Sequence, residues 1–308
     1  MKIITITLNP AFDIHYKVDN LELNRENYAT DAVKNAGGKG INISRALTFF
    51  GVENKALLVT GEENGKEFLE CLVKEKLFYE SINKPGKIRE NITLHTNSGE
   101  TRISCESSKT DVEVLNIIYG KIKNEYEKDM LVTFTGRLCE GIEKMEAITF
   151  IKNLKKLGIK VIVDCNSFNK DDILEIKPYL IKPNEQEISE LLGNIEINDS
   201  DIKKAAKTFY NEGIENVMIS LGANGFIFHN GEGCFKVSVP KITPISTIGA
   251  GDSTIAGFAA GLSQELALCE ILRLAGAFGA AACLTEGTNP PEKEKILKLF
   301  DEVTCKSV

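Results

Sequence analysis

Hydrophobic and polar positions along the chain follow two periods, which separate the expected strands from the expected helices. Residues 3–8 alternate β-branched and polar side chains, a pattern typical of a strand. From residue 111 onward, short apolar runs alternate with amphipathic stretches, and this order indicates a mainly parallel sheet covered by helices. We predict further strands at 56–59, 130–134, 160–163, 180–181 and 216–219, a hairpin at 225–239, and helices at 65–76, 112–126, 142–157, 184–192 and 199–212.

Two segments depart from this alternation and predict a small second domain. Residues 14–33 are polar and lack the pattern of a core helix, and residues 87–104 alternate around Asn97-Ser98-Gly99, as a β-hairpin does. We therefore expect a small β lid formed by residues 14–33 and 87–104. It would be inserted into a main α/β domain formed by residues 1–13, 34–86 and 105–308.

Composition and charge limit the classes of partner. The chain has 308 residues, of which 43% are hydrophobic and 26% charged, so it can bury a large core. A formal net charge of -7 argues against nucleic acid as the main partner, although a local basic pocket for a small phosphate stays compatible with it. We also expect no membrane partner and a cytoplasmic location, because no apolar run could span a bilayer and no export signal precedes the first strand.

The cysteine and histidine residues predict no special chemistry. The eight cysteines are scattered without a Cys-x-x-Cys pair, and only three histidines are present. We therefore expect neither disulfides nor structural zinc. Three histidines also give little support to a histidine-based catalytic triad.

The most informative stretch is a glycine-rich turn, Thr247-Ile248-Gly249-Ala250-Gly251-Asp252, ahead of the small-residue run 255–261. It predicts a turn that opens a tightly packed helix, whose free amide groups and positive dipole end form a site for a phosphate. A carboxylate at Asp252 would repel that anion, unless it takes a proton from a nucleophile that attacks the phosphate. The alternative is that Asp252 only stabilises the first helical turn, and this motif alone leaves both interpretations open.

A second glycine-rich turn, Gly37-Gly38-Lys39-Gly40-Ile41-Asn42, also leads into an expected helix. Lys39 could provide a point charge for an anion, and Asn42 could bind sugar hydroxyl groups. The nucleotide P-loop pattern is absent. A flexible turn with a solvated lysine is the plainer alternative.

Polar residues follow four of the expected strands, where parallel strands share one edge of the sheet. These residues are Gly136 and Arg137, Asp164 and Asn166, Lys182 and Asn184, and Ser220 and Gly222. Because ligands bind at this edge in α/β sheets, the four strand ends predict a cleft. Asp13 follows the first strand in the same way.

Two further sets of polar residues each allow a structural and a functional interpretation. Asn184 and Glu187 fit a helix capping pair, but they could also hold water-coordinated Mg²⁺ against nucleotide phosphates, and both roles can coexist. Arg89 and Arg102 on the expected hairpin are either solvated charges or clamps on a phosphorylated ligand.

Taken together, these motifs resemble the ribokinase-like family of carbohydrate kinases, within it the branch of 1-phosphofructokinases and tagatose-6-phosphate kinases. They occur in order over nearly the full length, as Thr5, Leu8-Asn9-Pro10-Ala11-Phe12-Asp13, Gly37-Gly38-Lys39-Gly40-Ile41-Asn42, Lys182-Pro183-Asn184-x-x-Glu187, Ser220-Leu221-Gly222-x-x-Gly225 and Gly249-Ala250-Gly251-Asp252-Ser253. The resemblance implies a doubly wound, mainly parallel sheet flanked by helices, with a small β-sheet lid. It also implies a homodimer that pairs through the lid, and ATP and Mg²⁺ as cofactors.

The resemblance also assigns roles. Asp252 would be the general base, and the amides of Gly249, Ala250, Gly251 and Asp252 would form an anion hole. Asn184 and Glu187 would support Mg²⁺ through water, and the ATP site would comprise Lys182, Asn184, Ser220, Gly222, Gly225 and Gly251. Sugar hydroxyls would contact Asp13, Gly38 and Asn42, and the substrate's phosphate would contact Lys39, Arg89 and Arg102.

Two segments differ from the family pattern. Thr135-Gly136-Arg137-Leu138-Cys139-Glu140-Gly141 stands where the family commonly has Ser-Gly-Ser-Leu-Pro-Pro-Gly, so Arg137 would add a phosphate contact or change which sugar fits. Asp164-Cys165-Asn166-Ser167 also differs from the usual Asp-Thr-Ser run, which leaves the nucleotide contacts there open.

The leading hypothesis is an ATP-dependent kinase that converts fructose 1-phosphate to fructose 1,6-bisphosphate. A tagatose-6-phosphate kinase is the close alternative, because the sequence does not fix where the substrate's phosphate sits. A kinase for a nucleoside or an unphosphorylated sugar would leave Lys39, Arg89 and Arg102 without a shared anion. The alternative from another class is a sugar-phosphate sensor without catalytic activity.

Overall fold

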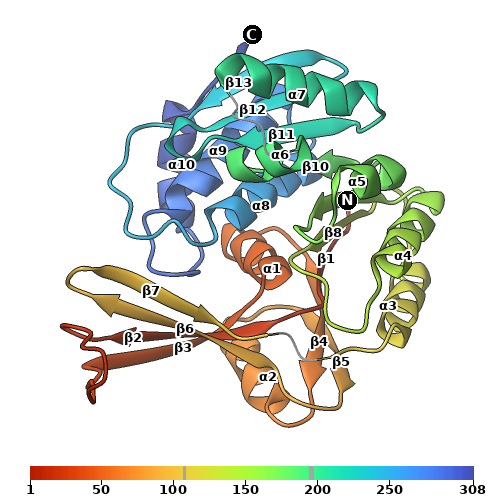
Figure 1. The fold of residues 1–308 in the computed structure, drawn as a ribbon. Helices are drawn as coiled ribbons and strands as arrows, with labels where there is room; N and C mark the ends of the chain where they lie inside the picture. Colours follow the sequence, from red (N-terminus) through yellow and green to blue (C-terminus); the bar gives the residue numbers. More distant parts are fainter. Residues whose placement is uncertain (107–108, 194–197) are drawn as a thin grey trace.

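The computed structural model describes residues 1–106, 109–193 and 198–308, which form one large and one small sheet (Figure 1). The large sheet has ten strands in the order β14 (Thr304–Ser307), β13 (Gly233–Ser238), β12 (Phe226–Asn230), β11 (Asn216–Ser220), β10 (Leu180–Ile181), β9 (Lys160–Asp164), β8 (Leu131–Thr135), β1 (Ile3–Thr7), β4 (Lys55–Gly61) and β5 (Tyr79–Lys84). The strands from β11 to β5 pair in parallel, while β11 to β14 pair antiparallel at the other edge.

The chain winds outward from β1 in both directions, because β1 pairs with β4 on one side and with β8 on the other. This is the doubly wound arrangement that the sequence predicts. In such sheets, ligands bind outside the carboxyl ends of the strands where the winding reverses. The topology therefore directs the search for a site to the carboxyl ends of β1, β8 and their neighbours.

Helices cover both faces of the large sheet. One face packs against α3 (Glu113–Asn124), α4 (Lys144–Lys156), α5 (Lys170–Ile176), α6 (Glu185–Leu191) and α7 (Asp199–Asn211). The other packs against α1 (Lys39–Phe50), α8 (Ala250–Ser263), α9 (Leu268–Ala282) and α10 (Lys293–Glu302). None of the helices within the described ranges is long and apolar enough to cross a membrane.

The small sheet projects from the main body as a four-stranded lid (Figure 1). Its order is β3 (Asp31–Gly37), β2 (Ala11–Lys17), β6 (Arg89–Thr96) and β7 (Gly99–Ser104), and α2 (Gly65–Lys74) packs against its root. The expected boundaries at residues 13 and 33 fall inside β2 and β3. The reason is that the β2–β3 pairing continues without interruption to Ala11 and Gly37.

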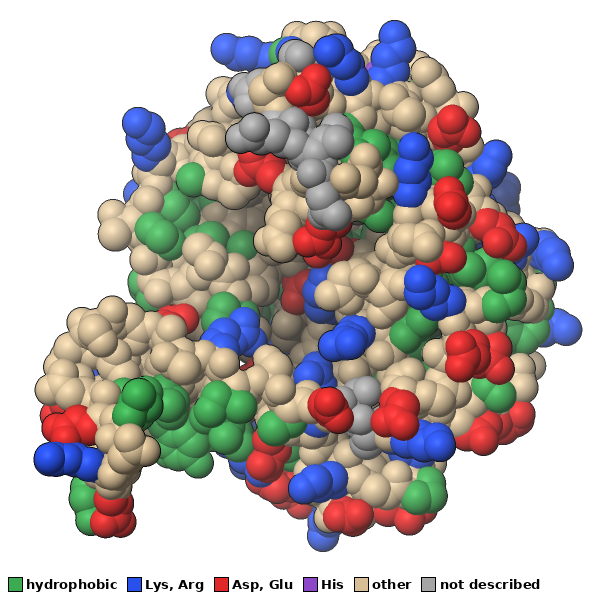
Figure 2. Space-filling view, in the orientation of Figure 1, with side chains coloured by type: hydrophobic (Ala, Val, Ile, Leu, Met, Phe, Trp, Pro, Cys, Tyr) green, Lys and Arg blue, Asp and Glu red, His purple; other side chains and the backbone are tan. Residues whose placement is uncertain are grey.

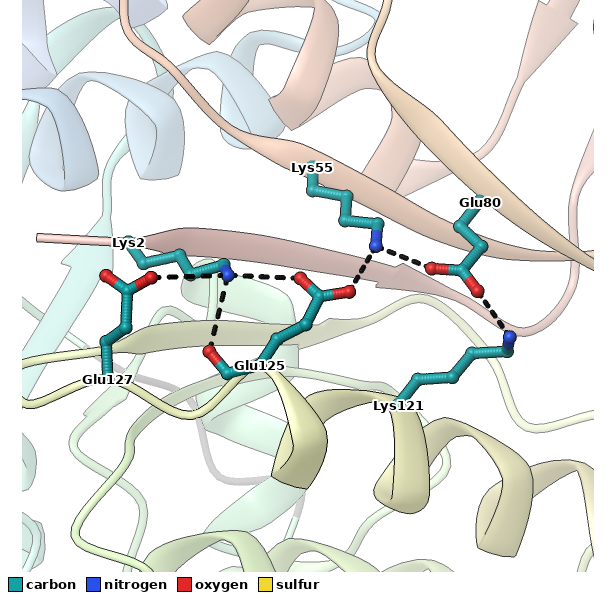
Figure 3. A network of polar contacts seen from close by, with 6 residues as sticks. All are labelled: Lys2, Lys55, Glu80, Lys121, Glu125 and Glu127. Atoms are coloured by element: carbon teal, nitrogen blue, oxygen red, sulfur yellow. Dashed lines mark hydrogen bonds and ion pairs between the residues drawn. The ribbon is translucent and has the colours of Figure 1, made fainter.

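An ion-pair network lies at the amino ends of the parallel strands, on the side of the sheet opposite to their carboxyl ends (Figure 3). Lys55 at the start of β4 contacts Glu80 and Glu125, and Lys2 and Lys121 contact the same two glutamates from either side. Hydrogen bonds from Lys121 and Lys55 lower the pKa of Glu80. Since each of these charges has a partner within the network, the network is a structural feature, which ties β1, β4, β5 and α3 together.

One further short helix, η1 (Gly222–Asn224), follows β11.

Candidate active site

A cavity of about 360 Å³ opens between the lid and the carboxyl ends of the central strands. In Figure 2 the surface is hollowed between the lid and the rest of the molecule, with basic side chains around the hollow. Most of the site residues expected from the sequence line this cavity, namely Asp13, Gly38, Lys39, Asn42, Arg89, Arg102, Lys182, Asn184, Glu187, Gly249, Gly251 and Asp252. The fold thus brings the two glycine-rich turns and the lid arginines to one place.

Asp252 sits in the first turn of α8, and its carboxylate lies in the wall of this cavity. The turn before it depends on Gly249, whose φ of 77° is in the left-handed region that suits glycine. Asp252 is only 6% exposed, and its Oδ2 accepts a hydrogen bond of 2.9 Å from Asn42 Nδ2. The carboxylate therefore engages a residue of α1 across the cavity, where a plain helix cap would bond to an amide of its own turn.

Asn42 is held in place by a buried arginine one turn further along α1. Arg45, which is 2% exposed, donates from Nη1 to Asn42 Oδ1 at 3.0 Å. The same guanidinium pairs with Glu75 at 2.8 Å and donates to the backbone carbonyls of Ala36 and Thr288. Because one planar group satisfies all these acceptors, it fixes which end of the Asn42 amide faces Asp252.

Two lysines and a second carboxylate surround Asp252. Lys39 Nζ lies 3.0 Å from Asp164 Oδ2, and Lys182 Nζ lies 4.0 Å from the same oxygen. Lys182 Nζ is also 3.0 Å from the position that a Cβ on Gly251 would occupy, which places its ammonium group against the first turn of α8. The start of α8 therefore faces a cavity wall with two fixed cations.

The two buried carboxylates have pKa values shifted in opposite directions. Burial raises the pKa of Asp252 to about 6, although Lys39 and the Asn42 hydrogen bond oppose the shift. Burial would also raise the pKa of Asp164, but Lys182 and Lys39 outweigh it and hold that pKa below its usual value. Of two such neighbours, the one with the raised pKa is the better proton acceptor near neutral pH. Asp252 is thus suited to act as a general base, with Asp164 a permanent anion.

The lid contributes the opposite wall of the cavity. Asn91 Nδ2 donates to Asp13 Oδ1 at 3.0 Å, which orients the Asp13 carboxylate. A Cβ on Gly37 would lie only 2.0 Å from Asp13 Oδ2, so this close approach requires glycine. Arg89 donates to the Asn91 side chain and to a backbone carbonyl, while its buried Nε atom has no hydrogen-bond partner among the residues that the structure describes. Arg89 therefore retains a free donor.

Asn184 and Glu187 form a capping box at the start of α6, as the structural interpretation expects. Asn184 Oδ1 accepts from the Glu187 amide at 2.8 Å, and Glu187 Oε2 accepts from the Asn184 amide at 2.9 Å. Both residues also line the cavity. A carboxylate has about four lone-pair sites, so capping leaves acceptor capacity on Glu187 toward the cavity.

Five of the expected site residues lie outside the lining of this cavity, namely Arg137, Ser220, Gly222, Gly225 and Ala250. Ser220 pairs with Asn184 through an isolated parallel bridge, so it lies directly beside the lining. Gly225 packs against the backbone of Val237, whose carbonyl oxygen lies 2.1 Å from the position of a Cβ at residue 225. The Ala250 amide, expected in the anion hole, donates to the Thr247 carbonyl at 3.4 Å. This leaves Gly251 and Asp252 with the amides that have no acceptor within the helix.

The structure also shows site residues that the sequence did not single out. Asp164 was noted as one of several strand ends and in a run that differs from the family pattern, but no role was assigned to it. Asn91, Arg45 and Thr288 were not considered. Asn91 shares a strand face with Arg89, and Arg45 lies one turn from Asn42. These spacings could have suggested two of them. Thr288 follows no regular element, and no pattern points to it.

A doubly wound sheet with a buried carboxylate of raised pKa at a helix start, flanked by lysines, fits an enzyme of the kinase class, which transfers a phosphoryl group to a hydroxyl. The family model of the pfkB family carbohydrate kinases matches residues 6–295, and the chain belongs to this family. It is a phosphotransferase that uses an alcohol group as acceptor and takes the phosphoryl group from ATP.

Solved structures agree with this assignment. The chain is similar to Escherichia coli phosphofructokinase-2 in complex with fructose-6-phosphate, with a TM-score of 0.90 and 26% identity over 98% of each chain. It also shares the fold of a Thermotoga maritima protein described as a possible 1-phosphofructokinase, with a TM-score of 0.86 and 23% identity over 100% of each chain. The ribokinase-like fold expected from the sequence motifs is confirmed.

Proposed function

We propose that this protein phosphorylates a ketohexose phosphate, with fructose 1-phosphate as substrate, fructose 1,6-bisphosphate as product and Asp252 as general base. The observation that carries the proposal is the placement of three charge functions around one cavity. The buried Asp252 carboxylate, the amide end of α8 beside Lys182, and the lid arginines all line it. A base, an anion hole and a second anion site are what transfer to a phosphorylated sugar requires.

The chemical step follows from these positions. Asp252 takes the proton of the acceptor hydroxyl as its oxygen attacks the terminal phosphorus of ATP, and the bond to the bridging oxygen breaks to release ADP. Negative charge on the transferred group is stabilised by the amides of Gly251 and Asp252 and by the Lys182 ammonium. Loss of one such preorganised donor typically costs about 3 kcal/mol of transition-state stabilisation.

Residues Asn184 and Glu187 are the ones we expect to support Mg²⁺. Within the described ranges, no group of three or more His, Cys, Asp or Glu side chains is placed to hold a metal ion. The spare acceptor capacity of Glu187 instead fits a hydrated ion held through its waters, a common mode for Mg²⁺ with nucleotides. When bound, Mg²⁺ neutralises charge on the nucleotide phosphates.

The first prediction concerns pH. Asp252 accepts a proton only when ionised, so kcat should rise as the pH increases through about 6 and fall on the acid side. Lys39 lowers the pKa of Asp252, so Lys39→Met should move the midpoint of this acid limb to higher pH. The phosphate of the free substrate titrates near the same pH. That titration is a property of the substrate alone, so it is the same in assays of the wild type and of Lys39→Met. Superimposable acid limbs for the two enzymes would exclude Asp252 as the titrating group.

The second prediction concerns the substrate's own phosphate. Arg89, Arg102 and Lys39 line the same cavity, and the buried Nε of Arg89 has no hydrogen-bond partner among the described residues. Arg89→Gln should lower kcat/KM for the sugar phosphate by roughly 10²-fold, because a charge-assisted contact is worth about 1.5–3 kcal/mol. The KM for ATP should change little. Equal losses for the sugar phosphate and for ATP would place Arg89 outside the sugar-phosphate site.

The identity of the ketohexose phosphate needs a direct comparison. Fructose 1-phosphate, tagatose 6-phosphate and fructose 6-phosphate all carry their phosphate at the end opposite to the terminal hydroxyl, so a cavity with Asp252 at one side and arginines at the other suits each of them. The similarity to phosphofructokinase-2 in complex with fructose-6-phosphate favours that sugar as a second candidate. Tagatose-6-phosphate kinase remains the alternative from the sequence motifs.

The deciding experiment measures kcat/KM for these three sugars under matched conditions, with unphosphorylated fructose as the control. We expect fructose 1-phosphate to be preferred. A tenfold preference for another of the sugars, about 1.4 kcal/mol in transition-state binding, would replace it as the substrate. No ADP formation with any sugar would instead support a sensor that binds sugar phosphates without turnover.

We also propose that the protein is a homodimer that pairs through the lid. Arg102 and Asn91 point into the cavity, so by strand alternation Ile92, Leu94 and Ile103 lie on the opposite lid face. Ile103 is 50% exposed, and Figure 2 shows hydrophobic side chains gathered on the lid. An apolar sheet face of this kind is typical of an interface. A solved form of phosphofructokinase-2 is described as tetrameric.

The third prediction tests this pairing. Ile103→Asp should convert the dimer to a monomer in analytical ultracentrifugation, because a charge would be buried in the apolar contact. The matched control is Leu297→Asp, since Leu297 is 48% exposed and lies on α10, which packs against α9. A wild-type monomer, or equal dissociation of both variants, would contradict pairing through the lid.

A further inference from the structure

Two cysteines that are far apart in the sequence have their sulfur atoms in contact. Cys269, the second residue of α9, and Cys305 in β14 have Sγ atoms 3.0 Å apart. A disulfide bond is about 2.05 Å long, so bond formation requires the sulfurs to approach by roughly 1 Å. All eight cysteines are free thiols in the structure. This contact is on the surface, well away from the cavity that Asp252 lines.

The backbone around the pair is fixed on both sides. Arg273, one turn after Cys269, donates to the carbonyls of Val303 and Phe300 at 2.9 and 2.7 Å. Cys305 itself is paired with Val237 in the ladder between β13 and β14. These contacts hold α9 against the C-terminal edge strand, so the two thiols meet without any rearrangement of the fold.

The two thiols differ in accessibility, and the surroundings of Cys305 raise its pKa. Cys269 is exposed, whereas Cys305 is partly buried. Burial and the neighbouring Cys269 sulfur raise the pKa of Cys305 to about 12, while the positive charge of Arg273 opposes this shift. Cys269 is therefore the thiol that reacts with a reagent first. Cys305 reacts second, once Cys269 is in a mixed disulfide and its thiolate no longer raises the pKa of Cys305.

We propose that Cys269 and Cys305 form a reversible modification site, which closes to a disulfide on reaction with a small disulfide such as oxidised glutathione. The Cys269 thiolate attacks one sulfur of the reagent, forming a mixed disulfide and releasing one glutathione thiolate. The Cys305 thiolate then attacks the Cys269 sulfur and displaces the second glutathione. Two protein thiols are oxidised and one reagent disulfide is reduced to two thiols, so atoms and electrons balance. The bond ties the C-terminal strand β14 to α9.

The test treats the folded full-length protein with oxidised glutathione and measures its intact mass and its cross-linked peptides. We expect the Cys269 and Cys305 peptides to be recovered as a single cross-linked pair, lighter by two hydrogens than the two free peptides, which dithiothreitol reverses. Glutathione on the exposed Cys105 is scored separately on its own peptide. The melting temperature should rise by roughly 5 °C, because the bond closes a loop of the unfolded chain. In Cys305→Ser the second step is missing, so Cys269 should keep one glutathionyl group.

Three results would overturn the proposal. The wild type could accumulate the same mixed disulfide as Cys305→Ser, it could form a disulfide between two molecules, or it could stay unmodified under conditions that modify Cys305→Ser. Cys269→Ser gives an independent check, because Cys269 is exposed and the substitution leaves the core intact. In that variant Cys305 should remain a free thiol, and its modification at the wild-type rate would also contradict the proposed order.

Discussion

Replacing Asp252 with asparagine is expected to lower kcat by roughly 10²- to 10⁴-fold, because the acceptor hydroxyl then loses its general base. Asparagine has nearly the same size and still offers an oxygen to Asn42, whose amide lies 2.9 Å from the carboxylate. Binding of the sugar phosphate and of ATP should therefore be largely retained. Steady-state ADP formation gives kcat, and titration calorimetry gives the two dissociation constants.

The matched control for this substitution is Asp172→Asn. Asp172 occupies the same third position of a helix as Asp252 does, and it caps α5 through its bond to the Asn169 amide at 2.8 Å. If Asp252 only stabilised the first turn of α8, the two variants would lose stability to a similar degree and both would keep their activity. A kcat for Asp252→Asn close to that of Asp172→Asn would show that Asp252 is not the general base.

Replacing Arg45 with methionine is expected to give the second largest loss of activity, although Arg45 is a positioning residue outside the cavity lining. The guanidinium holds Asn42 Oδ1 at 3.0 Å, and Asn42 in turn donates to Asp252. Without it the Asn42 amide can rotate, so we expect kcat to fall by about 10²-fold through misplacement of the base. The Asn42 hydrogen bond lowers the pKa of Asp252, so the acid limb of kcat should also move to higher pH.

Arg273→Met separates this positioning role from a loss of stability. Arg273 is a partly buried arginine on α9 that donates to two backbone carbonyls near the C-terminus and lies over the Phe300 ring. Its loss should lower the melting temperature without a change in the pH profile of kcat. Should Arg45→Met lower the melting temperature alone, with kcat and its acid limb as in the wild type, Arg45 would be purely structural.

Much of the fold and part of the site follow from local sequence. The βα alternation from residue 111 gives the parallel strands, because each strand carries its own apolar run and each helix its own period. The glycine turns before α1 and α8 can also be predicted from local sequence, because the backbone conformation at these helix starts favours glycine over other residues. This is why Lys39, Asn42 and Asp252 could be expected at one ligand site before their contacts were known.

The remaining contacts depend on side chains that converge from distant parts of the chain. Asp164 stands at a strand end like several other polar residues in the sequence, and only the structure shows that Lys39 and Lys182 both approach its carboxylate. Arg45 looks like a surface arginine in the sequence, yet it is buried, and two of its four acceptor residues, Glu75 and Thr288, come from distant segments. The Cys269–Cys305 contact joins residues 36 positions apart, which spacing alone cannot show.

The claim that this site transfers a phosphoryl group to a sugar phosphate is tested most directly by phosphorus NMR of the reaction with ATP and fructose 1-phosphate. The account predicts that one new phosphate ester appears on the sugar for each ADP formed, and that both signals grow at least about 10²-fold more slowly with Asp252→Asn. ADP that accumulates without a bisphosphate, or a bound sugar phosphate that is never converted, would contradict it.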